Sequence, residues 1–414
     1  MRQLLPIISK PKDIISTFDL VIRNTYLQAK FLWQYKSIAL PILFRQLFYN
    51  IYKFPSLHHG SVRTLPYEIV ALISRKCFLS CVTCGAKAMY GSDKKFTDFI
   101  DTSLLRRIAD ELASWKKLVY VKMTGGEPAM HPDLFDILEY YTFRGIPIRL
   151  STNGVFFSLK ERAFALVEAG LEVITISLDG IPEKHNTIRR GKNLYAKVAQ
   201  AIAYIKERKK QLNTRKPMIQ VATIVSQTNY DSLPQFVTEL EELGVDWLQI
   251  GFVQYVRDAA GLASQRVCRE LGGVGDDKWL FWRDSQLMNI TGIDPYVLEG
   301  AFKEVFSRPR SFPISVVNIG GLNAEDLKRY HFTDEVIHHN LCSNPYVSMV
   351  ILPPGLATFC IDFPQFFYGD LREKSLAEIW FSDKAQELRR KFLNYYQQHG
   401  QNMPHCLRCG WRFW

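Results

Sequence analysis

Seven of the eight cysteines fall into two groups whose spacing is suited to binding iron or zinc. The first group reads Cys77-Phe-Leu-Ser-Cys81-Val-Thr-Cys84. Three thiolates on one short loop can bind three irons of a 4Fe–4S cluster and leave the fourth iron open to a small molecule. Zinc would need a fourth ligand nearby, and no histidine lies between Tyr67 and Met130. The local pattern therefore favours an open 4Fe–4S cluster.

The second group comprises Cys342, Cys360, Cys406 and Cys409. Four thiolates are enough to ligate one complete 4Fe–4S cluster. The alternative is one zinc ion, because structural zinc sites also use four thiolates. Both alternatives remain open from the residues alone, with the iron–sulfur cluster favoured.

A regular alternation of strand and helix patterns surrounds the first cysteine group. Apolar, β-branched runs predict six strands, at residues 67–74, 117–124, 147–151, 173–178, 218–225 and 245–252. Helical periodicity predicts five helices between them, at residues 103–114, 132–143, 159–169, 194–208 and 231–243. The strands are almost all apolar along their length. This pattern indicates an α/β fold with a parallel sheet whose outer face is covered by helices.

Short polar motifs follow several of these predicted strands, at the end of a parallel sheet where chemistry gathers. Gly125-Gly126-Glu127 follows the second strand, and its glycines would let the backbone approach a ligand closely. Its carboxylate can accept hydrogen bonds from an ammonium group. Further polar residues occur at or after the third and fourth strands, namely Ser151, Asn153, Ser177, Arg189 and Arg190.

In this order the motifs resemble those of radical S-adenosylmethionine (radical SAM) enzymes, over about Tyr67 to Tyr255. The resemblance implies a partial (β/α)6 barrel in which Cys77, Cys81 and Cys84 hold the cluster that cleaves S-adenosylmethionine (SAM). It also implies a set of SAM contacts: Gly125, Gly126 and Glu127 at the amino group, Ser151 and Asn153 at the ribose, Ser177 as a further contact, and Arg189 at the carboxylate, with Arg190 as the alternative arginine.

The C-terminal part, residues 341–414, resembles the SPASM auxiliary-cluster domain of radical SAM enzymes in a shortened form. Its four cysteines imply one auxiliary 4Fe–4S cluster in a small α+β domain. Within it, residues 347–361 predict a β-hairpin that turns at Pro353-Pro354-Gly355. The reduced cysteine number weakens a peptide-modifying assignment, because shortened versions also occur in enzymes that act on sugars and other alcohols.

Residues 1–65 differ in composition from the rest of the chain. They contain nine Lys or Arg and two Asp or Glu, a surplus of +7 out of the net +11, together with many apolar and aromatic residues. We predict a helical segment on an anionic membrane surface; the alternative is a helical cap on the barrel. No recognition module accompanies the charge, so nucleic-acid binding is not expected. The predicted units are residues 1–65, a core at 66–255, a connector near the barrel mouth at 256–340, and the auxiliary domain.

Oxygen-labile clusters imply a reducing cytoplasm, where residues 1–65 would attach the enzyme to the inner face of the membrane. The basic surface is expected to steer an acidic flavodoxin or ferredoxin, the electron donor, toward the clusters. The expected activity is radical abstraction of hydrogen from a substrate carbon. A lipid, lipid-linked or glycosyl substrate is favoured by residues 1–65. The alternatives are a maturase of a ribosomally made peptide or protein residue, and a non-catalytic iron–sulfur scaffold or electron-transfer protein. Cys268 is expected to be a buried structural thiol, or else a hydrogen-atom donor to a substrate radical.

Overall fold

The computed structural model describes residues 60–84, 97–116, 119–273, 292–317, 321–333, 335, 341–361 and 366–409. The predicted membrane segment, residues 1–65, therefore lies almost wholly outside the described residues. Among the residues that are described, no helix is both long and apolar enough to cross a membrane.

The described strands form one sheet in the order β10-β9-β8-β1-β2-β3-β4-β5-β6-β7. Neighbouring strands from β8 to β7 are parallel, whereas β8, β9 and β10 pair antiparallel with one another. Their bounds are β1 Glu68–Ser74, β2 Tyr120–Gly125, β3 Ile148–Thr152, β4 Val173–Ser177, β5 Met218–Val225, β6 Trp247–Phe252, β7 Ile314–Val316, β8 Ser348–Leu352, β9 Leu356–Thr358 and β10 Gly369–Asp370. The predicted α/β fold with a parallel sheet is confirmed.

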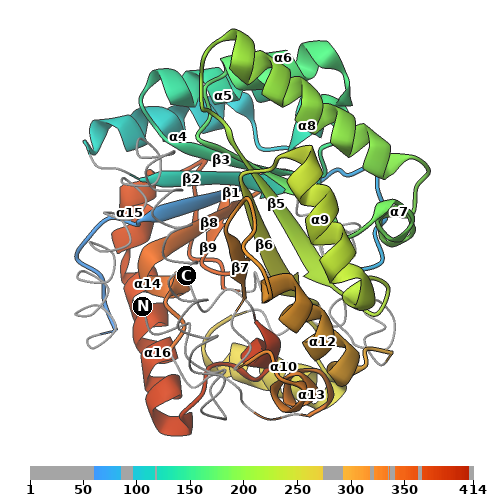
Figure 1. Ribbon diagram of the computed structural model, residues 1–414. Helices are drawn as coiled ribbons and strands as arrows, with labels where there is room; N and C mark the ends of the chain where they lie inside the picture. Colours follow the sequence, from blue (N-terminus) through green and yellow to red (C-terminus); the bar gives the residue numbers. More distant parts are fainter. Residues whose placement is uncertain are drawn as a thin grey trace.

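Helices cover the outer face of the curved sheet (Figure 1). Those of the core are α4 Thr102–Ser114, α5 Leu134–Phe143, α6 Lys160–Glu168, α7 Pro182–Arg189, α8 Leu194–Gln211 and α9 Leu233–Leu243, with 3-10 turns η1 Pro128–Met130, η2 Val155–Ser158 and η3 Tyr230–Ser232. The later helices are α10 Asp258–Glu270, α12 Pro295–Phe306, α13 Ala324–Phe332, α14 Asn344–Val347, α15 Leu376–Phe381 and α16 Asp383–His399, followed by η5 Pro404–Arg408. The short helix α7 and the strand β7 were not expected from the sequence.

The two faces of the central strands differ in character. In β3, Ile148 and Leu150 are fully buried and belong to the core under the helices, whereas Arg149 and Ser151, which alternate with them, are half-buried. The almost wholly apolar strand pattern therefore does not extend to the inner face of β3. An open barrel leaves its inner face available to polar groups, because helices cover only the outer face.

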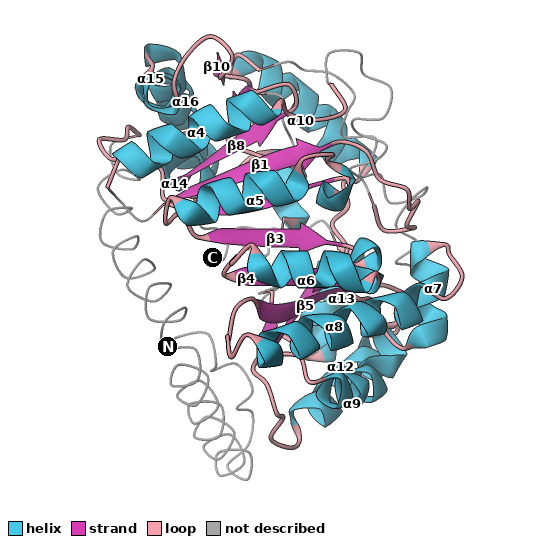
Figure 2. Cartoon of the chain, turned by 90° about the horizontal axis from the view of Figure 1, so that it is seen from above, coloured by secondary structure: helices cyan, strands magenta, loops and turns pink. Residues whose placement is uncertain are grey.

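The C-terminal hairpin joins the same sheet rather than forming one of its own. Strand β8 pairs in parallel with β1, and β8 and β9 form the predicted hairpin around Pro353-Pro354-Gly355. Helices α15 and α16 lie beside this end of the sheet (Figure 2). Trp380 of α15 donates a hydrogen bond to the Thr64 carbonyl at 2.8 Å. The auxiliary region and the barrel thus share one continuous sheet, and the domain boundaries drawn from the sequence remain predictions.

Candidate functional site

The loop that carries the first three cysteines is held at both of its ends. Where it leaves β1, the Gly126 N–H donates to the Ser74 carbonyl and the Glu127 N–H to the Lys76 carbonyl, each at 2.7 Å. Farther along, the Val82 N–H donates to the Ile188 carbonyl of α7 at 2.9 Å. The loop is therefore fixed between the carboxyl end of β2 and the last turn of α7.

The two glycines at the end of β2 allow the backbone of this loop to approach closely. A Cβ atom on Gly126 would lie 2.5 Å from the Lys76 carbonyl oxygen and 2.6 Å from that of Arg75. Gly125 has φ = 142°, and a Cβ there would overlap the Ser74 carbonyl. In the structure, the absence of a Cβ on these glycines lets the backbone of the cysteine loop pass close to them. The sequence analysis had expected a ligand to approach them instead.

The three thiols of the loop share one partly buried environment. Burial, together with the nearby charges of Glu127, Cys81 and Cys84, raises the pKa of Cys77 to about 11. Burial also raises the pKa of Cys81, which Arg189 opposes. Thiolates in such a setting need a bound cation to be stable. The donor set therefore fits an iron–sulfur cluster, which supplies that charge.

Arg189 lies between the cysteine loop and the end of β4. Its guanidinium pairs with Asp179, with Nε at 2.6 Å and Nη2 at 2.5 Å from Oδ2. Its Nη1 lies 3.7 Å from the Cys81 Sγ. The neighbouring Arg190 is exposed and ends α7 in a left-handed conformation, φ = 54°. Of the two candidate arginines, Arg189 is therefore the one beside the predicted cluster ligands.

Asp179, which follows β4, was not identified as a site residue from the sequence. It is fully buried, and its second oxygen, Oδ1, accepts from the Ile224 N–H at 3.0 Å. Its own backbone N–H donates to Nδ1 of buried His185 at 3.1 Å. Burial lowers the pKa of His185 to about 4, so the imidazole stays neutral and can accept this bond. Its position directly after β4 was the available signal for Asp179.

Glu127 joins the turns that follow β2 and β3. Its carboxylate accepts from Thr152 Oγ1 at 2.6 Å, from the Asn153 N–H at 2.7 Å and from the Ala129 N–H at 3.0 Å. Burial raises its pKa, which these bonds oppose. Glu127 thus positions Asn153, and its predicted contact with the SAM amino group stays a prediction.

Asn153 presents a buried donor that has no hydrogen-bond partner in the described structure. Its Oδ1 accepts from the Val155 N–H at 3.0 Å, whereas Nδ2 is buried and unpaired. Buried donors normally find a partner, so a ligand is expected to fill this role. Ser151 and Ser177 lie half-buried at the ends of neighbouring strands β3 and β4. These groups fit a polar ligand such as SAM.

A polar layer crosses the inner face of the sheet near these serines. Arg149 Nε donates to Thr175 Oγ1 at 2.8 Å, Thr175 Oγ1 donates to Gln220 Oε1 at 2.9 Å, and Gln220 Nε2 donates to Gln249 Oε1 at 3.2 Å. Burial raises the pKa of the nearby Glu68 carboxyl, opposed by the charges of Lys122 and Arg149. Because Lys122 and Arg149 outnumber the single Glu68 carboxyl, this layer has a net positive charge.

The four auxiliary cysteines lie on segments around η5 and the hairpin, and all are partly buried. The Cys342 N–H donates to Asn402 Oδ1 at 2.8 Å, and the Cys406 N–H donates to the Met403 carbonyl at 2.8 Å. The first of these bonds brings two distant parts of the sequence together. Among the described residues no three His, Cys, Asp or Glu side chains meet closely enough to chelate one metal ion.

Cys268 lies on the buried face of α10 and is fully buried. Gly273 faces both it and Phe366, because a Cβ on Gly273 would meet the Cys268 Sγ at 2.5 Å and Phe366 at 2.7 Å. Phe366 belongs to the auxiliary region, which favours the structural interpretation of this thiol. Its alternative role as a hydrogen-atom donor stays a prediction.

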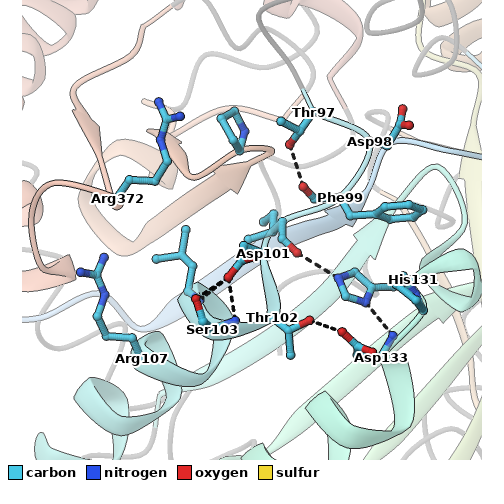
Figure 3. Close-up of a pocket in the computed structure, with 14 residues that line it drawn as sticks. Thr97, Asp98, Phe99, Asp101, Thr102, Ser103, Arg107, His131, Asp133 and Arg372 are labelled. Atoms are coloured by element: carbon cyan, nitrogen blue, oxygen red, sulfur yellow. Dashed lines mark hydrogen bonds between the residues drawn. The ribbon is translucent and has the colours of Figure 1, made fainter.

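A cavity of about 730 Å³ lies beside the start of α4 (Figure 3). Its polar side chains largely bond to one another: Asp101 caps α4, and His131 bonds the Ile100 carbonyl at 2.9 Å and the Asp133 N–H at 3.2 Å. None of the predicted site residues lines it. The cavity is thus separate from the group formed by the cysteine loop, Arg189 and Asn153.

Family models match both parts of the chain that carry the two cysteine groups. A model of the radical SAM superfamily matches residues 72–215. A model of an iron–sulfur cluster-binding domain, SPASM, matches residues 342–410.

Two curated relatives span most of the chain. A tungsten-containing aldehyde ferredoxin oxidoreductase cofactor-modifying protein of Pyrococcus furiosus is 24% identical over 82% of this chain and 86% of its own length. An Fe-coproporphyrin III synthase of Methanosarcina barkeri is also 24% identical, over 83% of this chain and 80% of its own length. Among solved structures, Streptococcus suis SuiB bound to S-adenosylmethionine superposes with a TM-score of 0.55 at 14% identity, covering 81% of this chain and 69% of that chain. SuiB is also known bound to its precursor peptide SuiA.

Proposed function

Since the chain belongs to the radical SAM superfamily and carries a SPASM domain, we propose that it is a maturase that modifies a peptide or a cofactor precursor. Relatives that act on cofactors, and a fold neighbour that binds a precursor peptide, support this class of substrate. They favour it over the lipid or glycosyl substrate that the N-terminal segment suggested.

The observation that carries the proposal is the grouping of the cysteine loop, the Arg189–Asp179 pair and the unpaired Asn153 amide at one edge of the sheet. Cys77, Cys81 and Cys84 would hold the cluster. When reduced and with SAM bound, that cluster would supply the electron that cleaves SAM to methionine and a 5′-deoxyadenosyl radical, the species that would abstract hydrogen from the substrate.

The protein's own residues orient SAM. Arg189, held by Asp179, would pair with the SAM carboxylate. Gly125, Gly126 and Glu127 would lie at the amino group, Ser151 and Asn153 at the ribose, and Ser177 would be a further contact. Fixed groups of this kind promote reaction because they position the reactants in advance.

The polar layer favours a polar substrate over an aliphatic chain. Arg149 and Thr175 each lie two residues before a proposed SAM contact, Ser151 and Ser177 respectively. A cationic guanidinium there would attract a carboxylate, such as that of a peptide or of a carboxylated cofactor precursor. A lipid tail carries no group that this guanidinium could bind.

The test begins with anaerobic reconstitution of the full chain. We expect about eight irons per chain from two 4Fe–4S clusters. Replacing Cys77, Cys81 and Cys84 together by Ala should halve the iron and abolish 5′-deoxyadenosine formation from SAM. About four irons with one zinc in the unmodified protein would exclude the auxiliary cluster formed by Cys342, Cys360, Cys406 and Cys409.

Substrate class is tested by incubating the loaded enzyme with SAM and dithionite in separate peptide, cofactor and lipid extracts of the host. Mass spectrometry should find SAM-dependent changes in the peptide or cofactor fraction. Changes confined to the lipid fraction would contradict the maturase proposal.

Two partners belong to the same proposal. A flavodoxin or ferredoxin would deliver the electron, attracted by the basic chain. Residues 1–65 would bind an anionic membrane surface, each basic residue contributing about 1 kcal/mol there. The full chain should then pellet with anionic vesicles at low salt and be released at high salt, and a chain that begins at Ser61 should stay in solution. Equal pelleting of both would exclude the membrane role of this segment.

A further inference from the structure

We infer that His405 donates a hydrogen bond to the Cys406 thiolate and thereby raises the reduction potential of the auxiliary cluster. His405 precedes Cys406 in η5, and its Nε2 lies 3.5 Å from the Cys406 Sγ. This inference rests on the proposed function, in which Cys406 is a ligand of that cluster.

Ser264 determines which nitrogen of His405 carries the proton. This serine of α10 is fully buried. Its Oγ accepts from the His405 backbone N–H at 2.7 Å and lies 3.1 Å from His405 Nδ1. A buried hydroxyl needs an acceptor for its own proton, and within the part of the chain that is described Nδ1 is the acceptor in reach. Nδ1 therefore accepts, and the proton of the neutral imidazole is on Nε2, facing Cys406.

A donor in this position changes the energy of the reduced cluster. Hydrogen bonds to the sulfurs are among the factors that set the potential of iron–sulfur clusters. Reduction adds negative charge, which an N–H group directed at Sγ stabilises. The auxiliary cluster therefore becomes a better electron acceptor, suited to taking an electron from a substrate radical.

The orientation of this donor is set from outside the auxiliary domain. His405 and Cys406 belong to the segment matched by SPASM, whereas Ser264 belongs to the connector after the barrel. Helix α10 packs against η5, so the connector fixes the imidazole at the auxiliary site.

The experiment uses the full chain with Cys77, Cys81 and Cys84 replaced by Ala, so that only the auxiliary cluster contributes a signal. This parent should hold about four irons. Its midpoint potential is measured by redox titration with detection by electron paramagnetic resonance. His405→Ala should shift the midpoint to a more negative value, and His405→Gln, whose amide can reach the same sulfur, should restore part of the shift. Ser264→Ala should give an intermediate value. Iron content should stay the same in all four proteins.

An unchanged midpoint in His405→Ala at full iron content would overturn the inference. A second measurement on the parent does not depend on the variants. With ¹⁵N-labelled histidine, pulsed electron paramagnetic resonance should detect one nitrogen weakly coupled to the reduced cluster. A strong coupling would make His405 a ligand and no coupling would remove the contact, and either result overturns the inference. A parent that holds zinc instead of iron would overturn the auxiliary cluster itself, and the metal content distinguishes this failure from the loss of the hydrogen bond alone.

Discussion

At the scale of single residues, the proposed SAM site depends on side chains that are positioned by hydrogen bonds to other buried side chains. Asp179 holds Arg189 beside Cys81, and His185 accepts the backbone N–H of Asp179. The Glu127 carboxylate likewise accepts a hydrogen bond from the Asn153 backbone N–H. These residues contribute through geometry, so their substitution should alter stability and SAM binding before it alters the iron content.

The neutral state of His185 makes stability depend on pH. In the unfolded chain its pKa is near 6.5, and burial lowers the folded value to about 4. Below pH 6.5 the unfolded state therefore takes up a proton that the folded state does not bind until about pH 4. The free energy of unfolding should fall by about 3 kcal/mol from this residue over that window.

Urea denaturation of the metal-free protein at several pH values would measure this slope. His185→Asn keeps an acceptor for the Asp179 N–H but cannot be protonated, so this variant should lose that part of the slope. The same slope in both proteins would assign the effect to other groups.

Substitution of the two arginines should give different results. Arg189→Ala leaves the buried Asp179 carboxylate without its charge partner, which should cost about 3–5 kcal/mol of unfolding free energy and weaken SAM binding strongly. Arg190→Ala is the matched control, because that side chain is exposed and its loss should change neither quantity. Calorimetric titration with SAM would measure binding, and a larger effect from Arg190→Ala would identify it as the carboxylate-binding arginine instead.

At the scale of elements, the end of β2 acts as a support for the cysteine loop. Gly126→Ala would place a methyl group 2.5 Å from the Lys76 carbonyl oxygen, so the loop would have to move. We expect the reconstituted variant to lose the iron of the first cluster and keep that of the auxiliary cluster, about half the total.

Gly300→Ala serves as the control for this substitution. Gly300 lies within α12, and a Cβ there meets nothing within 4 Å. This variant should keep all of its iron and gain about 0.5–1 kcal/mol of stability. Full iron in Gly126→Ala would show that the loop tolerates displacement.

At the scale of the whole molecule, the barrel and the auxiliary region fold as one sheet. Removing residues 341–414 would delete β8 and expose the edge of β1, and unpaired edges promote aggregation. It would also remove Trp380 and Gln386, which donate hydrogen bonds to the carbonyls of Thr64 and Val62.

A chain ending at residue 340 should therefore be aggregated or unfolded, as judged by size-exclusion chromatography and circular dichroism. The four-fold variant of Cys342, Cys360, Cys406 and Cys409 to Ser is the control. It lacks the auxiliary ligands but keeps β8, so it should remain folded and retain the first cluster. A monomeric, folded truncation would show that the core is independent.

The sequence by itself determined the six central strands and their five helices, because their hydrophobic periodicity is local and strong. In the same way it predicted the cysteine loop and the hairpin at Pro353-Pro354-Gly355, since short spacings and turn residues act over a few positions. The family resemblance, read from the order of these motifs, agrees with the matches to radical SAM and SPASM.

Only the tertiary structure decided which groups meet across the sheet. The pairing of β8 with β1, the contact of Arg189 with Cys81, and the bond from the His405 N–H to Ser264 each join residues far apart in the sequence. Such contacts depend on how strands and helices are arranged in space, for which local periodicity carries no signal. The choice between Arg189 and Arg190 has the same cause: adjacent residues at the end of a helix point in different directions, and the packing of α7 decides which one faces the loop.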